Sequence, residues 1–224
     1  QKEDIKAMER TLTVIGKGRT ATTPDTIQIE LCLKATDKNY ETVSLIAVKQ
    51  YNEMCDCLHK VGIAKDEIKT TDYSVTTEYE MRRNTNNTNV RTFVGYTCTH
   101  LMKVKLPLDM KHLSDVLSAL STCSAVPSID LSFTCEDQEA IKQKLLISAA
   151  EDAKIKAQVL ADASGIELVE ICSVQLLSIL SDSVSPTRYN NSVRSMNVTA
   201  IEMTPDVFES SCEVSYVWSI APKK

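Results

Sequence analysis

The stretch VIGKGRTATTPDTIQIEL, residues 14–31, combines an apolar run, two closely spaced glycines and a regular alternation of apolar and polar residues. From Thr26 onward every second residue is apolar: Ile27, Ile29, Leu31 and Leu33. A period of two predicts a strand with one buried face. Pro24 and Asp25 predict a turn before it. The stretch is therefore expected to form a strand, a turn and a second strand, which together open a first hairpin.

The pair Gly16 and Gly18 raises the question of a phosphate-binding loop. A dinucleotide-binding loop needs a third glycine and a following helix whose N-terminus faces the pyrophosphate. Here Ala21 takes the place of the third glycine, and the next predicted element is a strand. The Gly-Lys-Ser/Thr ending of a P-loop is absent as well. The glycines are expected to be structural, and we expect no cofactor.

Composition limits the classes of partner. The chain has 224 residues, a net charge of −5 and 25% charged residues. A net negative charge argues against nonspecific binding to nucleic acid or to an anionic membrane. No apolar run is long enough for a membrane-spanning helix. The sequence begins at Gln1 and shows no signal peptide, which leaves open a leader that has been removed.

Helices and strands alternate along the rest of the chain. Three polar residues, Asn39, Asp109 and Asp137, are placed to cap helices that end near Val61, Thr122 and Ala163. Gly62 and Gly165 follow the first and third of these helices. Further strands are expected at 11–18, 70–81, 90–106, 128–135, 167–180, 197–203 and 207–220. The pair 70–81 and 90–106 reads as a long hairpin, with polar loops at 82–89 and 181–196.

The predicted order suggests an internal duplication. A β-α-β-β unit occurs twice, over about 26–106 and 128–220, without detectable residue identity between the copies. The expected fold is α+β, with an antiparallel or mixed sheet and two main helices on one face. Alanines recur every four residues in the longest helix and suggest close packing: Ala149, Ala153, Ala157 and Ala161. We expect a flexible segment at 1–10 and a single domain over 11–221.

No catalytic or metal-binding constellation stands out. On a helix, Cys55 and His59 share a face while Cys57 points away, so three metal ligands cannot converge. The only other histidines are His100 and His112, and neither lies in a catalytic motif. The acids of residues 135–139 suit a helix start. We expect no catalytic and no metal-binding residue, and mostly free, buried thiols among eight cysteines.

Several motifs, taken in order, resemble the SIMPL-domain family. Four motifs follow the pattern of that family. They are the opening strand with its G-x-G and Pro-Asp, the segment IKTTDYSVTTEYE, the Gly-Tyr strand FVGYTCTHLMKVKL and the Ala-rich helix ending in glycine. The residues that match are Gly16, Gly18, Pro24, Asp25, Gly95, Tyr96 and Gly165. The resemblance implies that they determine the fold, since the family offers no catalytic residue to carry over.

The resemblance also implies a role without catalysis. Bacterial members are typically exported and associated with the envelope or with oxidative stress, and some resemble ring-forming oligomers, while animal members resemble kinase-binding adaptors. We therefore expect a homo-oligomer or a binder of an unknown protein partner, periplasmic or in the cell envelope after removal of a signal peptide. The cysteine content leaves a cytoplasmic location open. Two alternatives remain: a small-ligand-binding protein or enzyme with a helix–sheet pocket, and a thiol-based redox role.

Overall fold

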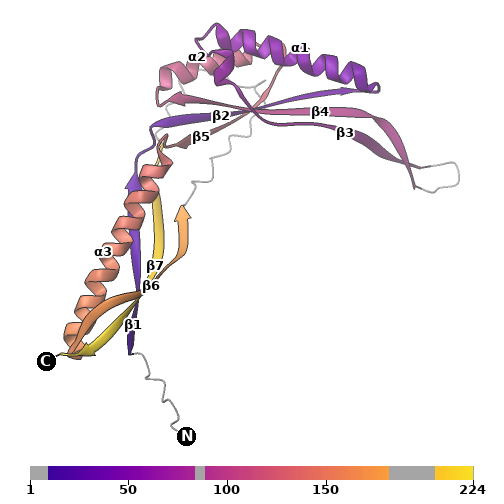
Figure 1. The fold of residues 1–224 in the computed structure, drawn as a ribbon. Helices are drawn as coiled ribbons and strands as arrows, with labels where there is room; N and C mark the ends of the chain where they lie inside the picture. Colours follow the sequence, from indigo (N-terminus) through magenta and orange to yellow (C-terminus); the bar gives the residue numbers. More distant parts are fainter. Residues whose placement is uncertain (1–9, 84–88, 182–204, 224) are drawn as a thin grey trace. The chain divides into compact units, whose positions relative to one another are not determined.

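A computed structural model describes residues 10–83, 89–181 and 205–223 (Figure 1). The elements divide into two compact units, each with its own antiparallel sheet. Their order is β1 (Thr11–Thr22), β2 (Thr26–Asp37), α1 (Tyr40–His59), the short 3-10 helix η1 (Lys65–Glu67), β3 (Lys69–Arg83), β4 (Asn89–Pro107), α2 (Met110–Ser121), β5 (Ser128–Thr134), α3 (Gln138–Ser164), β6 (Ile166–Ser181) and β7 (Phe208–Pro222). The α+β class with antiparallel sheets is thus confirmed.

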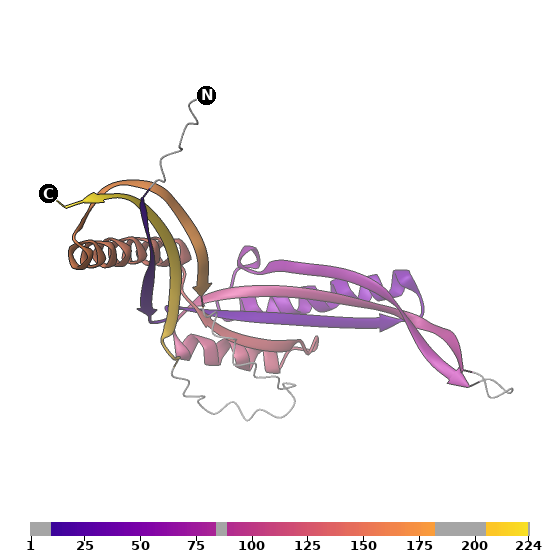
Figure 2. The ribbon, with the colours of Figure 1, turned by 90° about the horizontal axis from the view of Figure 1, so that it is seen from below.

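The four-stranded unit contains β2 to β5, with strand order β3-β4-β2-β5. Ile27, Ile29, Leu31 and Leu33 are at most 2% exposed and share one core cluster, as the alternation predicts. Helices α1 and α2 supply the other side of that cluster, with Met54, Leu58 and Val116 among its members. Figure 2 shows both helices beside this sheet. The hairpin of β3 and β4 is also present.

Capping residues define the helix ends at the predicted positions. The side chains of Asn39, Asp109 and Asp137 each accept hydrogen bonds from backbone N–H groups in the first turn of α1, α2 and α3. Such caps satisfy N–H groups that have no partner within the helix. Gly165 ends α3 with a left-handed φ of 64°, a conformation that disfavours side chains with a Cβ.

The three-stranded unit contains β1, β6, β7 and α3, with strand order β1-β7-β6. Helix α3 packs on one face of this sheet, and its regularly spaced alanines are fully buried there: Ala149, Ala153, Ala157 and Ala161. Trp218, Val14 and Val214 complete the small core between helix and sheet. Because alanine is short, the helix backbone lies close to the strands.

Two expectations about strand pairing need correction. Strands β1 and β2 form no hairpin, because β1 pairs along its whole length with β7 while β2 pairs with β4 and β5. The strand at 128–134, assigned from sequence to the second repeat, is β5 and completes the sheet of the first. In consequence the helices lie on two sheets, α1 and α2 on one and α3 on the other, instead of sharing one face. The two sheets are similar in this respect: β1 pairs with β7 in the three-stranded sheet as β2 pairs with β4 in the four-stranded sheet.

Some expectations fall outside the described residues. These are the segment 1–9, most of the loop at 82–89, the loop at 181–196 and the strand at 197–203.

Candidate functional site

Gly16 and Gly18 lie in β1, directly beneath α3. A Cβ on Gly16 would stand 2.0 Å from the carbonyl oxygen of Ala149 and 2.7 Å from the Cβ of Ala153. A Cβ on Gly18 would stand 2.1 Å from the carbonyl oxygen of Leu145. The glycines therefore allow strand and helix to approach, and the space above them is filled by the helix backbone.

Pro24 and Asp25 connect β1 to β2 at the start of the four-stranded unit. The Asp25 N–H donates to the carbonyl oxygen of Thr134 at 3.2 Å, and its own carbonyl oxygen accepts from the Leu108 N–H at 2.8 Å. Its carboxylate accepts from the Thr26 hydroxyl at 2.7 Å. The connection is thus tied to both neighbours of β2, a role in positioning the strand.

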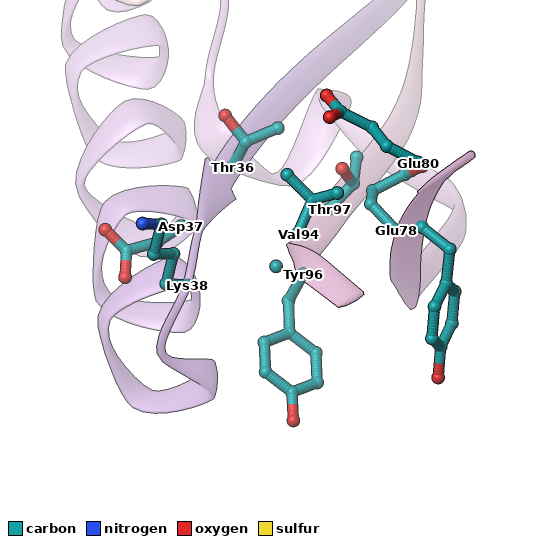
Figure 3. A pocket seen from close by; sticks show the side chains of 10 residues that line it. Thr36, Asp37, Lys38, Glu78, Glu80, Val94, Tyr96 and Thr97 are labelled. Carbon is teal, nitrogen blue, oxygen red and sulfur yellow. The ribbon is translucent and has the colours of Figure 1, made fainter. Parts of the chain in front are cut away.

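Gly95 and Tyr96 line a cleft of about 500 Å³ between the end of β2 and the hairpin of β3 and β4 (Figure 3). A Cβ on Gly95 would stand 2.6 Å from the carbonyl oxygen of Asp37, so the strands meet here through backbone. The charged lining consists of Asp37, Lys38, Glu78 and Glu80. The lining residues come from strands and from Lys38 directly after β2, and none of them is a histidine, serine or cysteine. The expectation of a ligand pocket between helix and sheet stays a prediction.

A row of aromatic rings runs beside this cleft. Tyr40 contacts Tyr96, Tyr96 contacts Phe93, and Phe93 contacts Tyr79, all edge to face with ring centroids 5.2–5.8 Å apart. The Arg91 guanidinium lies 4.0 Å from the Tyr79 ring centroid, a cation–π contact. Such pairs favour fixed geometries. The row therefore holds this part of the hairpin in one arrangement.

The cysteines and histidines are dispersed over the fold. Cys55 is buried in α1, Cys57 is half-buried and His59 is exposed at the end of the same helix. Among the described residues, no group of three or more His, Cys, Asp or Glu is placed to hold a metal ion. All eight thiols are free, five of them buried, and only Cys172 is exposed.

His100 is a buried histidine of the four-stranded unit. It is 8% exposed, its Nε2 lies 2.9 Å from the Thr70 hydroxyl oxygen, and the rings of Tyr51 and Tyr73 flank it at 5.2 Å. Burial lowers the pKa of His100 below its ordinary value of 6.5. A hydrogen bond with Cys98 raises the pKa of Tyr73 to about 12, together with burial. Both residues are thus kept neutral.

We expect acid to destabilise the chain through His100. Below pH 6.5 His100 is protonated in the unfolded chain but still neutral in the folded chain, because its pKa is lower there. The free energy of unfolding therefore falls as the pH drops from 6.5 to the pKa of folded His100. His100→Gln should flatten that dependence in urea titrations at stepped pH. The exposed His59→Gln serves as the control, and an equal flattening by both variants would contradict the assignment.

Strand β6 is the most exposed apolar element of the three-stranded unit. It pairs with β7 along one edge, and no described strand pairs with its other edge. Four of its side chains stand opposite the core residues of β7 yet are 39–54% exposed: Ile171, Val174, Leu176 and Ile179. Opposite residues share a face, so these four continue the core layer beyond the cover of α3. Register shifts bend the strand, but residues 171–181 include no charge and no proline.

The family assignment rests on a match that covers most of the chain. The family model of SIMPL proteins, described as proteins of unknown function (DUF541), matches residues 12–218. The chain belongs to the SIMPL family.

Two curated relatives are named proteins of Brucella. The 26 kDa periplasmic immunogenic protein of Brucella melitensis is 21% identical over 178 residues, which are 80% of this SIMPL chain and 71% of that protein. The protein of the same name from Brucella abortus has the same identity and coverage. Among solved structures, the regulatory subunit of aspartate kinase from Thermus flavus is 13% identical over 93% of this chain and 90% of that one, with a TM-score of 0.19.

In this SIMPL protein, sequence reasoning found β6 but missed its exposure. The sequence predicts the strand at 167–180 but does not indicate which of its residues are buried. Apolar residues occur on both faces of the strand, a pattern typical of a fully buried strand, so its exposure follows only from the structure. None of the helices among the described residues has both the length and the apolar character to cross a membrane.

Proposed function

We propose that this SIMPL protein works without catalysis, as a self-assembling protein, and that two copies pair through β6. The observation that carries the proposal is the apolar edge of that strand, which has no charged residue over 171–181. Edge strands are usually protected from pairing by lysine, proline or bulges. Strand β6 has bulges but neither lysine nor proline.

The binding partner that best fits this edge is strand β6 of a second copy of the chain. Antiparallel pairing around a two-fold axis would place the uncharged residues 171–181 of one copy against those of the other. No like charges would meet over that stretch, and both main-chain edges would gain hydrogen bonds. The side chains of Val174, Leu176 and Ile179, now partly exposed, would be covered.

We also propose that the protein acts in the periplasm or envelope. The Brucella relatives are named as periplasmic proteins, and this supports the same location here. Fractionation of the source cells, with immunodetection of the chain, should find it outside the cytoplasmic fraction. Recovery in the cytoplasmic fraction would contradict the location without affecting the assembly proposal.

The assembly is tested by solution mass. Sedimentation equilibrium of the full chain should give at least twice the chain mass, and Leu176→Lys should raise the dissociation constant by about tenfold or more, because a buried ammonium would face apolar side chains. Ile155→Lys on α3 is the matched control: Ile155 is 65% exposed, lies in the same unit and gains the same charge. A monomer at every concentration, or equal weakening by both variants, would refute pairing through β6.

A further inference from the structure

Side chains of α3 form hydrogen bonds with the outer edge of β1. Strand β1 pairs with β7 along its inner edge, and no described strand pairs with its outer edge. The Lys17 N–H donates to the Asp152 carboxylate at 2.7 Å, and the Ile15 carbonyl oxygen accepts from the Lys156 ammonium at 3.3 Å. Ile15 and Lys17 are two residues apart, so their main-chain groups point to the same edge of the strand. The two side chains therefore occupy main-chain groups that an added strand would need.

Asp152 and Lys156 are also bonded to each other. They lie four residues apart on α3, where side chains are neighbours, and the Lys156 ammonium donates to the Asp152 carboxylate at 2.7 Å. Each directly precedes a fully buried alanine of the helix, Ala153 or Ala157. The hydrogen bonds from Lys156 and from the Lys17 N–H lower the pKa of Asp152, which favours the charged form that accepts both bonds. The packing of α3 on the sheet thus holds the ion pair along the edge of β1.

The two outer edges of this sheet differ in charge as well. Strand β1 carries two cations, Lys17 and Arg19, whereas residues 171–181 of β6 carry no charge. The Lys17 ammonium forms an ion pair with Glu213 of β7 at 2.8 Å. Charged side chains on an edge strand oppose the addition of another strand. Strand addition is therefore opposed at β1, by charge and by occupied main-chain groups, and is not opposed in these ways at β6.

We propose that Asp152 and Lys156 close the β1 edge to strand addition, so that assembly through this sheet stops at two copies. The inference rests on the pairing through β6 proposed above. Copies that join head to tail through two different edges form chains that do not close, whereas a two-fold contact between identical edges closes at once. A β1 edge that lost the ion pair would take β6 of another copy, because a second β1 would bring the cations of both strands together.

The test removes the ion pair from the full-length chain. In sedimentation equilibrium, the double variant Asp152→Ala, Lys156→Ala should exceed twice the chain mass and grow with concentration, whereas the wild type should level off at twice the chain mass. The matched control is Glu139→Ala with Lys142→Ala, which removes an ion pair of the same charges near the start of α3 and should behave as wild type. Adding Leu176→Lys to the first double variant should abolish the growth. Circular dichroism checks that each variant keeps its fold.

Amide hydrogen exchange tests the edge directly in dilute protein. The single variant Asp152→Ala should speed the exchange of the Lys17 N–H by about tenfold or more, because that group loses a charged acceptor. The Gly18 N–H, one residue further and thus directed toward β7, should keep its rate. An unchanged rate at Lys17 would overturn the proposal even where the double variant fails to fold.

The outcomes separate this proposal from the pairing through β6. A folded double variant that levels off at twice the chain mass would overturn the closed edge and leave the pairing through β6 in place. A wild type that grows beyond two copies would also overturn it, and so would equal growth in the control. A monomeric wild type would refute the pairing through β6 and, with it, the limit of two copies.

Discussion

Replacing Gly16 by alanine is expected to destabilise the chain by about 3 kcal/mol or more. The added Cβ would stand 2.0 Å from the carbonyl oxygen of Ala149, which belongs to the backbone of α3 and has no rotamer to change. Either the helix must move off the sheet or β1 must leave its register with β7. Urea unfolding followed by circular dichroism measures the loss.

Two further variants make this test specific to the strand–helix contact. Thr13→Ala, at an exposed position of the same strand, should change the free energy of unfolding by less than about 0.5 kcal/mol. Ala153→Gly in the Gly16→Ala background should restore little, because it removes the Ala153 Cβ but leaves the carbonyl oxygen of Ala149 in place. A wild-type midpoint for Gly16→Ala would mean that β1 does not lie this close to α3.

Much of the local structure was predictable because its causes lie within a few residues. The alternation from Ile27 to Leu33 depends only on the period of a strand, and the structure confirms it. The caps Asn39, Asp109 and Asp137 bond backbone groups two or three residues away. The capping side chain and the first turn of its helix therefore lie in the same short stretch of sequence.

The sheet assignments failed because strand pairing depends on residues far apart in the chain. Strand β1 is followed at once by β2, and short connections favour a hairpin. Its observed partner, β7, is the last strand of the chain. Nothing in residues 11–22 specifies that partner, although Gly16 and Gly18 do indicate a close neighbour above the strand.

The candidate site was only partly predictable for a related reason. The position of β6 follows from its composition, but its exposure depends on how far α3 extends across the sheet. The alanines of α3 lie over β1 and β7, where Gly16 and Trp218 contact the helix, and leave Leu176 of β6 about half exposed. The Gly95 and Tyr96 positions were likewise recognised as a motif, whereas their cleft requires three strands to meet.

Replacing Ile29 by alanine is expected to cost about 2–5 kcal/mol. Ile29 is 1% exposed and lies on β2, between β4 and β5, in the core that α1 and α2 cover. Its neighbours come from several elements, so they cannot all move in to fill the space left by the lost methyl groups. The midpoint of urea unfolding, followed by far-ultraviolet circular dichroism, reports the change in the free energy of unfolding.

The neighbouring position provides a matched control, because adjacent residues of a strand face opposite sides of the sheet. Gln28→Ala, one residue away, should cost less than about 0.5 kcal/mol, and Ile29→Val about 0.5–1.5 kcal/mol. A graded loss from valine to alanine at Ile29 indicates lost burial, whereas disruption of strand pairing would affect Gln28 as strongly. Equal costs at the two positions would therefore contradict the assignment of the Ile27 to Leu33 face to the core, and with it the register of β2.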